Sequence, residues 1–107
     1  MQTLALDETM LALSDATRRA ILQRLADGEA RVTELAQPFD ISLNAVSKHI
    51  RVLERADLVT RRKAGREHFL SLNAKPLDEA AAWIEQQRNL WNMRLDALER
   101  ALAAHDD

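Results

Sequence analysis

The chain has 107 residues with a net charge of −2, 47% apolar and 30% charged residues, and no cysteine. These values predict one folded globular domain, and they exclude disulfides, thiolate metal sites and thiol redox sensing. No apolar run is long enough to cross a bilayer and no basic-then-apolar segment opens the sequence, so we expect a cytoplasmic protein.

The small net charge conceals an asymmetry along the chain. Between Lys48 and His68 there are seven Lys or Arg and three acids, a net charge of +4. From Leu77 to the end there are three Arg and seven acids, a net charge of −4. One basic and one acidic module in the same chain indicate two separate tasks. Random clustering of charge is the alternative.

Two helices are expected before residue 28. The first is short and amphipathic and begins at Asp7 and Glu8, because acids favour a helix N-terminus. The second is capped by Ser14 or Asp15 and closes at Gly28, where a left-handed residue can end a helix. Its inner face is expected to hold Ala16, Ile21, Leu22 and Leu25. Its cations, expected in solvent or close to phosphates, are Arg18, Arg19 and Arg24.

A short helix, a tight turn and a longer helix follow, in the order of a helix-turn-helix motif. Thr33 is expected to cap the short helix, residues 34–37, and Pro38 ends it because proline cannot continue the hydrogen-bond ladder. Phe39 and Ile41 are expected to hold the turn against the core.

The helix predicted over residues 42–56, with Ser42 as its N-cap, has two different faces. Its apolar row is Leu43, Val46, Ile50 and Leu53. Its outward row contains no acid and consists of Asn44, Ser47, Lys48, Arg51 and Arg55. Cations neutralise phosphates, and Ser or Asn can reach base edges in a major groove, so this pattern predicts a DNA-recognition helix. A solvated amphipathic helix with accidental charge is the alternative.

A basic hairpin is predicted directly after this helix. Residues 58–62 and 67–72 alternate in the manner of strands, and residues 63–66 form the turn between them. In this place a hairpin is typical of a wing, whose tip meets phosphates or a minor groove. The cations expected at the tip are Arg62, Lys63 and Arg66.

The longest predicted helix covers residues 77–104, with Pro76 near its first turn, where proline is tolerated. Its heptad-like seam is Leu77, Ala81, Ile84, Arg88, Trp91, Leu95, Leu98 and Leu102. A second apolar strip beside it is Trp83, Leu90, Met93, Ala97 and Ala101.

Two strips are more apolar surface than so small a domain can cover, so we expect a symmetric homodimer. Residues 1–13 and 77–104 are expected to form its interface, and which strip faces the partner stays open. The first segment contributes Leu4, Leu6, Met10 and Leu11, and the anchors on the long helix are Trp83, Leu90, Trp91, Leu95, Leu98 and Leu102. A monomer whose first segment covers the strip is the alternative.

The segments that carry a family resemblance are LSDATRRAILQRL, VTELAQPFDISLNAVSKHIRVLERADLV and TRRKAGREHFLSL. Over residues 10–102 the chain resembles the winged helix-turn-helix repressors of the ArsR/SmtB family, in the subgroup without sensing cysteines. The most specific part is S-x-x-x-V-S-K-H-I-x-V-L-E, at residues 42–54. The resemblance implies a mainly α fold with a small β-hairpin. It also implies a homodimer that blocks a promoter and leaves when an effector binds.

Two departures from the family pattern concern Asp57 and the metal sites. Asp57 stands where relatives usually have Gly, and we expect no change of role from it. Thiolate sites need cysteines, and the long helix offers only His105, beside Asp106 and Asp107. We therefore expect no metal and no cofactor, and any inducer is an unidentified small molecule.

The remaining chemistry is sparse. His49 flanks the apolar row and is expected to hydrogen-bond nearby or to touch a phosphate, and His68 has no second metal ligand at a useful spacing. No nucleophile–base pair, phosphate loop or carboxylate cluster is evident, so we do not expect an enzyme.

The expected DNA contacts divide by the part of DNA that they meet. Asn44, Ser47 and Lys48 approach bases. Ser42 and Arg51 meet phosphates or sugars, and the wing cations hold the backbone. A two-fold dimer places recognition helices about 34 Å apart, which predicts an inverted-repeat operator. The alternatives are a protein-interaction winged helix without sequence-specific DNA binding, a chromosome-packaging protein, and a metal sensor with an unfamiliar site.

Overall fold

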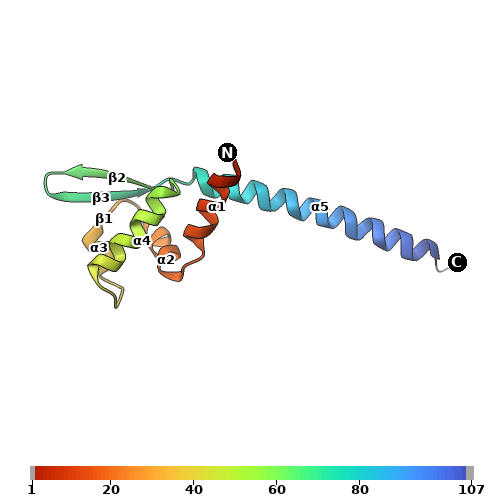
Figure 1. The fold of residues 1–107 in the computed structure, drawn as a ribbon, viewed down its shortest axis with the longest axis horizontal. Coiled ribbons are helices and arrows are strands. Elements are labelled where there is room, and N and C mark those ends of the chain that lie inside the picture. Colours follow the sequence, from red (N-terminus) through yellow and green to blue (C-terminus); the bar gives the residue numbers. More distant parts are fainter. Residues whose placement is uncertain (1, 106–107) are drawn as a thin grey trace.

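The computed structural model describes residues 2–105, and the side chains of residues 5–105 (Figure 1). The interface contact expected of Leu4, and the carboxylates of Asp106 and Asp107, therefore lie outside the described residues. The elements in chain order are α1 (Gln2–Leu13), α2 (Ala16–Leu25), β1 (Ala30–Arg31), α3 (Val32–Ala36), α4 (Leu43–Arg55), β2 (Val59–Ala64), β3 (Glu67–Leu72) and α5 (Lys75–His105).

This is the mainly α, winged helix-turn-helix order expected from the sequence, with one addition. The two-residue strand β1 pairs with β3, so the hairpin of β2 and β3 belongs to a three-stranded antiparallel sheet of order β1-β3-β2. In this sheet Ala30 lies opposite Leu70, and Val59 lies opposite Leu72. The added strand fastens the base of the wing to the segment just before α3.

The hairpin and α5 project from the helical body in opposite directions (Figure 1). The principal extents are 74 × 30 × 23 Å and the Cα radius of gyration is 19.7 Å. A compact domain of this length has a radius of gyration of about 13 Å, and the difference reflects the length of α5 that extends beyond the body. Within the described residues no helix is both long and apolar enough to span a membrane.

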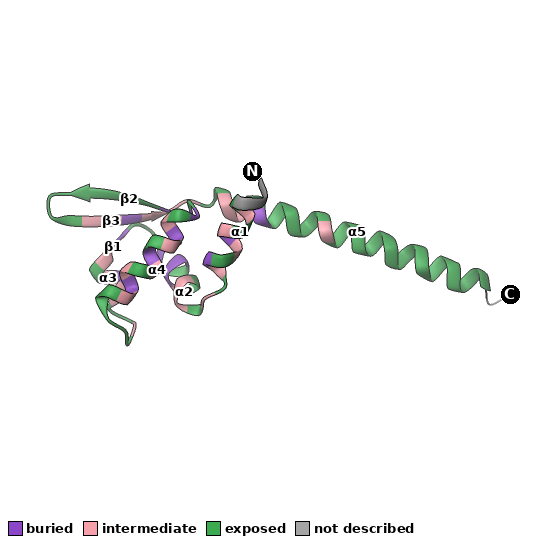
Figure 2. Cartoon of the chain, viewed as in Figure 1, coloured by how far each residue is buried: buried purple, intermediate pink, exposed green. Residues whose placement is uncertain are grey.

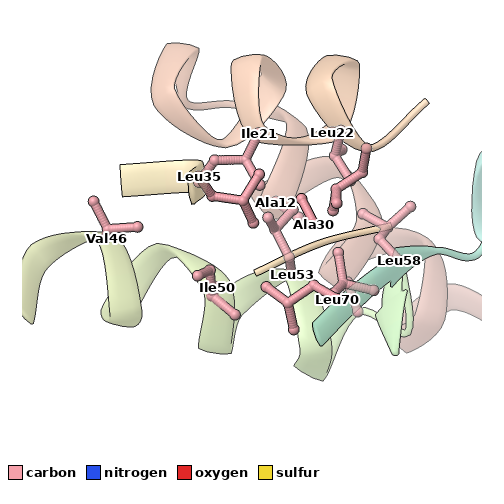
Figure 3. Close-up of a cluster of buried hydrophobic side chains, with 13 residues drawn as sticks. Ala12, Ile21, Leu22, Ala30, Leu35, Val46, Ile50, Leu53, Leu58 and Leu70 are labelled. Carbon is pink, nitrogen blue, oxygen red and sulfur yellow. The ribbon is translucent and has the colours of Figure 1, made fainter. Parts of the chain in front are cut away.

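The core lies between α1, α2, α4 and the sheet (Figure 3). The inward rows predicted for α2 and α4 are confirmed at Ile21, Leu22, Leu25, Val46, Ile50 and Leu53, all buried. Three expectations are wrong. Ala16 opens α2 and is exposed. Leu43, the first residue of α4, and Ile41, two residues before it, are also exposed, because the burial of α4 begins only at Val46.

The starts of three helices differ from the prediction, and α5 begins at Lys75 rather than at residue 77. Helix α1 begins at Gln2, so Asp7 and Glu8 lie in its middle rather than at its N-terminus. Helix α3 begins at Val32, and Thr33 does not cap it. Instead Glu34 accepts from the backbone N–H of Arg31 at 3.3 Å and from its Nε at 2.7 Å. The carboxylate at the third helical position thus satisfies the N–H of the N-cap residue, which is one half of a capping box.

The end of α4 sets the direction of the wing. Asp57, which stands where relatives usually have Gly, has a left-handed backbone, with φ of 59°. The N–H of Leu58 donates to the carbonyl of Leu53 at 3.0 Å, which is the closing bond of a Schellman cap. The carbonyl of Asp57 accepts from Nδ2 of Asn73 at 2.8 Å. Helix α4, the hairpin and the segment before α5 thus meet at this turn.

Candidate nucleic-acid interface

The outer face of α4 is formed as the sequence predicts. Its N-cap is Ser42, whose hydroxyl oxygen accepts from the N–H of Ala45 at 3.1 Å. The side chains of Asn44, Lys48 and Arg51 are exposed, and that of Ser47 is half-buried. None of these four makes a hydrogen bond or ion pair to any other part of residues 2–105. They are available to an external ligand.

The inner face of α4 is held from two sides. Val46, Ile50 and Leu53 are fully buried in the core (Figure 3). His49 is half-buried beside them, and its Nδ1 lies 3.1 Å from Nη1 of Arg18. The interpretation of His49 as a packed, hydrogen-bonded histidine is therefore confirmed. Arg18, expected in solvent or near phosphates, is instead a structural residue of the body.

Asp15 completes this contact. It is the N-cap of α2, and its carboxylate accepts from the N–H of Arg18 at 3.0 Å. This backbone hydrogen bond is the main reason why the pKa of Asp15 is lowered. Partial burial opposes the shift, and the nearby His49 and the Arg18 guanidinium add to it. The prediction that Ser14 or Asp15 caps α2 is confirmed, with Asp15 as the cap.

The wing cations divide into two kinds. Lys63 and Arg66 are exposed and unpaired within the described part of the chain. Arg62 is also exposed, but its Nη2 donates to Oε1 of Glu29 at 2.7 Å, and its guanidinium lies 4.6 Å from the centroid of the Phe69 ring. The turn is shorter than expected, because β2 runs to Ala64. Arg62 therefore lies on the strand behind the tip.

Two of the three acids of the basic module, Glu54 and Glu67, are also paired. Glu54 of α4 accepts from Arg61 of β2 through both carboxylate oxygens, at 2.8 and 3.1 Å. Arg31 bridges Glu34 and Glu67, with ion-pair distances of 2.7 and 3.0 Å. Among the described residues, the cations of this module that are left without an acid are Lys48, Arg51, Arg55, Lys63 and Arg66. The positive charge is thereby concentrated on the outer face of α4 and on the tip of the wing.

The residues expected at a dimer interface lie along α1 and α5. Leu6 and Met10 of α1 are half-buried and line an open groove of about 730 Å³, together with Ala80 and Trp83 of α5. Beyond Ala80 the helix α5 is almost entirely exposed (Figure 2). Its exposed large apolar residues are Trp83, Ile84, Leu90, Trp91, Met93, Leu95, Leu98 and Leu102.

The first apolar strip of α5 continues the face that is buried at Ala80. Ala80 is buried where α1 crosses α5, and Ile84, Trp91, Leu95 and Leu98 follow it at intervals of four, seven, four and three residues. Such intervals keep the residues on one side of a helix. The face that α1 covers at Ala80 therefore continues, uncovered by any described part of the chain, to the end of α5.

No three His, Asp or Glu side chains within residues 2–105 lie close enough together to hold a metal ion. His68 is half-buried on β3, and its buried Nδ1 has no hydrogen-bond partner among these residues.

Sequence reasoning missed three features of this region. The pairing of Arg62 with Glu29 joins residues 33 positions apart, and no local pattern indicates it. The Arg18–His49 contact spans 31 positions. The exposure of Leu43 contradicts the helical period itself, which places this residue on the buried row. Of these three features, only the pairing of an arginine with an acid had a signal in the sequence. The signal was the excess of cations over acids between Lys48 and His68, which favours contact of each acid with an arginine.

Comparisons with known proteins give a consistent result. Residues 13–62 match a family model described as a helix-turn-helix domain. The HTH-type transcriptional regulator Rv2034 of Mycobacterium tuberculosis is 38% identical over 101 residues, which are 94% of this chain and 92% of the relative. The transcriptional repressor SdpR of Bacillus subtilis is 33% identical over 73 residues, 68% of this chain and 81% of the relative.

Two solved structures have the same fold over most of their length. A crystal structure of an ArsR family transcriptional regulator has a TM-score of 0.81 and 39% identity, and covers 84% of this chain and 93% of that one. An ArsR-like transcriptional regulator from a Rhodococcus strain has a TM-score of 0.81 and 31% identity, with 92% of each chain covered.

Proposed function

The chain belongs to the ArsR family of DNA-binding transcriptional regulators, and we propose that it acts as a homodimeric repressor that occludes a promoter. The observation that carries this proposal is the combination of two unsatisfied surfaces. One is the unpaired cationic face of α4 and the wing tip, which suits a polyanion. The other is the uncovered apolar face of α5, which suits a second copy of the chain.

The DNA contacts that we propose follow the geometry of the first surface. Asn44, Ser47 and Lys48 approach base edges in the major groove, while Ser42 and Arg51 meet the backbone. The wing cations Arg62, Lys63 and Arg66 hold the flanking phosphates or minor groove. Unpaired Lys63 and Arg66 support this assignment directly. Arg62 has to leave Glu29 to take part.

The proposed dimer buries α1 and α5 of each copy. Trp91 is 61% and Leu98 is 56% exposed, and large exposed apolar faces mark interaction sites. A two-fold axis along this face presents two copies of α4 to one side of a duplex, about 34 Å apart, and so requires an inverted-repeat operator. The single domain then consists of residues 1–107, with residues 1–13 and 77–104 in the interface.

The finer properties follow from this role. We propose that the protein works in the cytoplasm, because its relatives are bacterial regulators and their DNA is there. Its relatives are named as regulators and not as enzymes, which supports a purely regulatory role for this chain. An inducer, where one exists, is a small molecule not yet identified. The name of the Bacillus subtilis relative supports repression rather than activation.

The test begins with the selection of genomic DNA fragments that the full chain binds. The affinity of the full chain for these fragments is then measured. The double variant Lys48→Ala, Arg51→Ala should lose affinity about tenfold or more. Its dependence on salt should weaken by about two phosphate contacts per dimer, one for the Arg51 of each copy. The matched control is Lys75→Ala, Arg100→Ala, which removes two exposed cations from α5, outside its apolar face. Equal affinity of the two double variants would contradict the recognition-helix assignment. Absence of duplex binding by the wild type would favour a protein-interaction module, and binding without sequence preference would favour DNA packaging.

A further inference from the structure

Two large apolar side chains are exposed at the N-terminal end of the recognition helix. Leu43, the first residue of α4, is 53% exposed, and Ile41, two residues before it, is 42% exposed. Every other large exposed apolar residue among residues 5–105 lies on α1 or α5, the two helices of the proposed dimer interface. Leu43 and Ile41 are therefore the apolar surface of the DNA-binding body that the dimer leaves uncovered.

Their position is that of base-reading residues. In a helix-turn-helix protein the N-terminal residues of the recognition helix contact base edges in the major groove. Leu43 is adjacent in sequence to Asn44 and lies one turn before Ser47, so it borders the side chains that we assign to bases. The first turn of α4 contains no acid. Nothing in this turn repels a phosphate backbone from approaching Leu43.

The chemistry of the major groove offers one clear partner for such a side chain. Each base pair presents hydrogen-bond donors and acceptors there, and thymine alone adds a methyl group. A leucine side chain cannot hydrogen-bond, but it can bury a methyl group against its own carbons. A pair of residues is too small a patch for a stable protein interface, and unpaired Lys48 and Arg51 on the same helix suit a polyanion.

We propose that Leu43 reads the 5-methyl group of a thymine in each operator half-site, with Ile41 covering the same methyl from the side. This inference rests on the proposed function and makes it more specific. The operator should contain an obligatory thymine in each half-site, close to the base that Asn44 contacts. The leucine then contributes to the choice of sequence as well as to affinity.

The experiment removes one methyl group at a time. The enriched operator is synthesised with deoxyuridine in place of each thymine in turn, in both half-sites, and titrated with the wild type, Leu43→Ala and Arg51→Ala. At one thymine position the wild type should lose affinity about fourfold per half-site, the ratio that corresponds to burying one methyl group. Leu43→Ala should show the same loss on the natural operator and no further loss on the deoxyuridine operator.

The control separates this contact from general binding. Arg51→Ala should bind both operators more weakly but keep the wild-type ratio between them, because it contacts the backbone. A second variant, Leu43→Gln, should change the base selected at that position from thymine to adenine, which glutamine can hydrogen-bond. If no thymine position is coupled to Leu43 while the wild type still prefers its operator, the inference is overturned and the proposed function stands. If the wild type prefers no sequence, the proposed function itself fails.

Discussion

Nη1 of Arg18 lies 3.1 Å from Nδ1 of His49, which joins the second helix to the recognition helix. The same guanidinium donates to the carbonyls of Ala12 and Leu11, each at 2.9 Å, at the end of α1. Arginine has no acceptor, so this contact is a hydrogen bond in which Nδ1 of the neutral imidazole accepts. One side chain thus ties α1, which we place in the dimer interface, to the helix that we place in the major groove.

Replacing Arg18 should therefore cost stability. Arg18→Ala leaves Nδ1 of His49 and the carbonyl of Ala12 without this donor, whereas the carbonyl of Leu11 still accepts from Ser14. We expect the free energy of unfolding to fall by about 1–3 kcal/mol. The measurement is urea denaturation at fixed protein concentration, since dimerisation shifts the midpoint. Arg19→Ala is the matched control, because Arg19 is exposed and donates to one carbonyl, that of Leu13. Equal effects of the two variants would show that the contact with His49 adds nothing.

Stability should fall in acid partly because of Asp15. The pKa of its carboxyl group is lowered in the folded state, chiefly by the N–H of Arg18. A lowered folded pKa means stability that is present above the ordinary value of 3.8 and is lost as the pH falls through the folded pKa. Asp15→Asn keeps a good helix cap but cannot titrate, so its stability should depend less on pH below about 4.

Acid titration of the wild type and of this variant, followed by the unfolding midpoint at each pH, makes that comparison. Some acid dependence should persist in Asp15→Asn. The pKa of Glu29 is also lowered, mainly by its hydrogen bond to Arg62, and that of Glu34 by its hydrogen bond to Arg31. Parallel curves for the wild type and the variant would show that Asp15 does not contribute to the loss of stability in acid.

The ion pair between Arg62 and Glu29 competes with DNA if Arg62 contacts phosphate. Glu29→Gln should then raise operator affinity, by up to about fivefold, since an exposed pair is worth up to about 1 kcal/mol. The gain should vanish in the double variant Glu29→Gln, Arg62→Ala. Glu85→Gln is the control, because it removes the same charge from α5, where its partner Arg88 lies away from the proposed DNA face. A gain of equal size in the control would indicate long-range charge rather than release of Arg62.

The side of α5 that meets a partner can be found with two glutamates. Leu98 lies on the face that continues from buried Ala80, whereas Met93 lies off this face and is 67% exposed. Leu98→Glu should produce monomers at micromolar concentration, because a charge buried in an apolar interface costs several kcal/mol. Met93→Glu should leave the dimer largely intact. Sedimentation velocity measures both, and the reverse pattern would assign the interface to the second strip.

The elements of this fold are encoded locally, and the contacts between them are not. Helix α4 was predictable because its cap and its apolar period lie within one short segment, and the alternation of the hairpin is equally local. The exposure of Leu43 was not predictable, since the helical period cannot show where the surrounding body ends. The β1 strand is only two residues long and exists because β3, nearly forty residues later, pairs with it.

The candidate site follows the same division. Asn44, Lys48 and Arg51 were identified because their spacing on one helix and the absence of acids between them are visible in the sequence. The role of Arg62 depends on Glu29, which lies before α3, and this relationship appears only once the sheet is assembled. Charge counts predict how many arginines are neutralised, but the fold decides which ones.

The turn at Asp57 and the pairing of Arg61 with Glu54 together give the recognition helix and the wing a fixed mutual orientation. Because α4 and the wing are held together within one copy of the chain, an inducer has little scope to move one relative to the other. In the proposed dimer, the quantity that can change is then the separation and tilt of the two units of α4 and wing across the two-fold axis. A molecule bound between α1 and α5 would release DNA by changing the distance and angle between the two copies of α4. Each copy of α4 and its wing would keep their own arrangement.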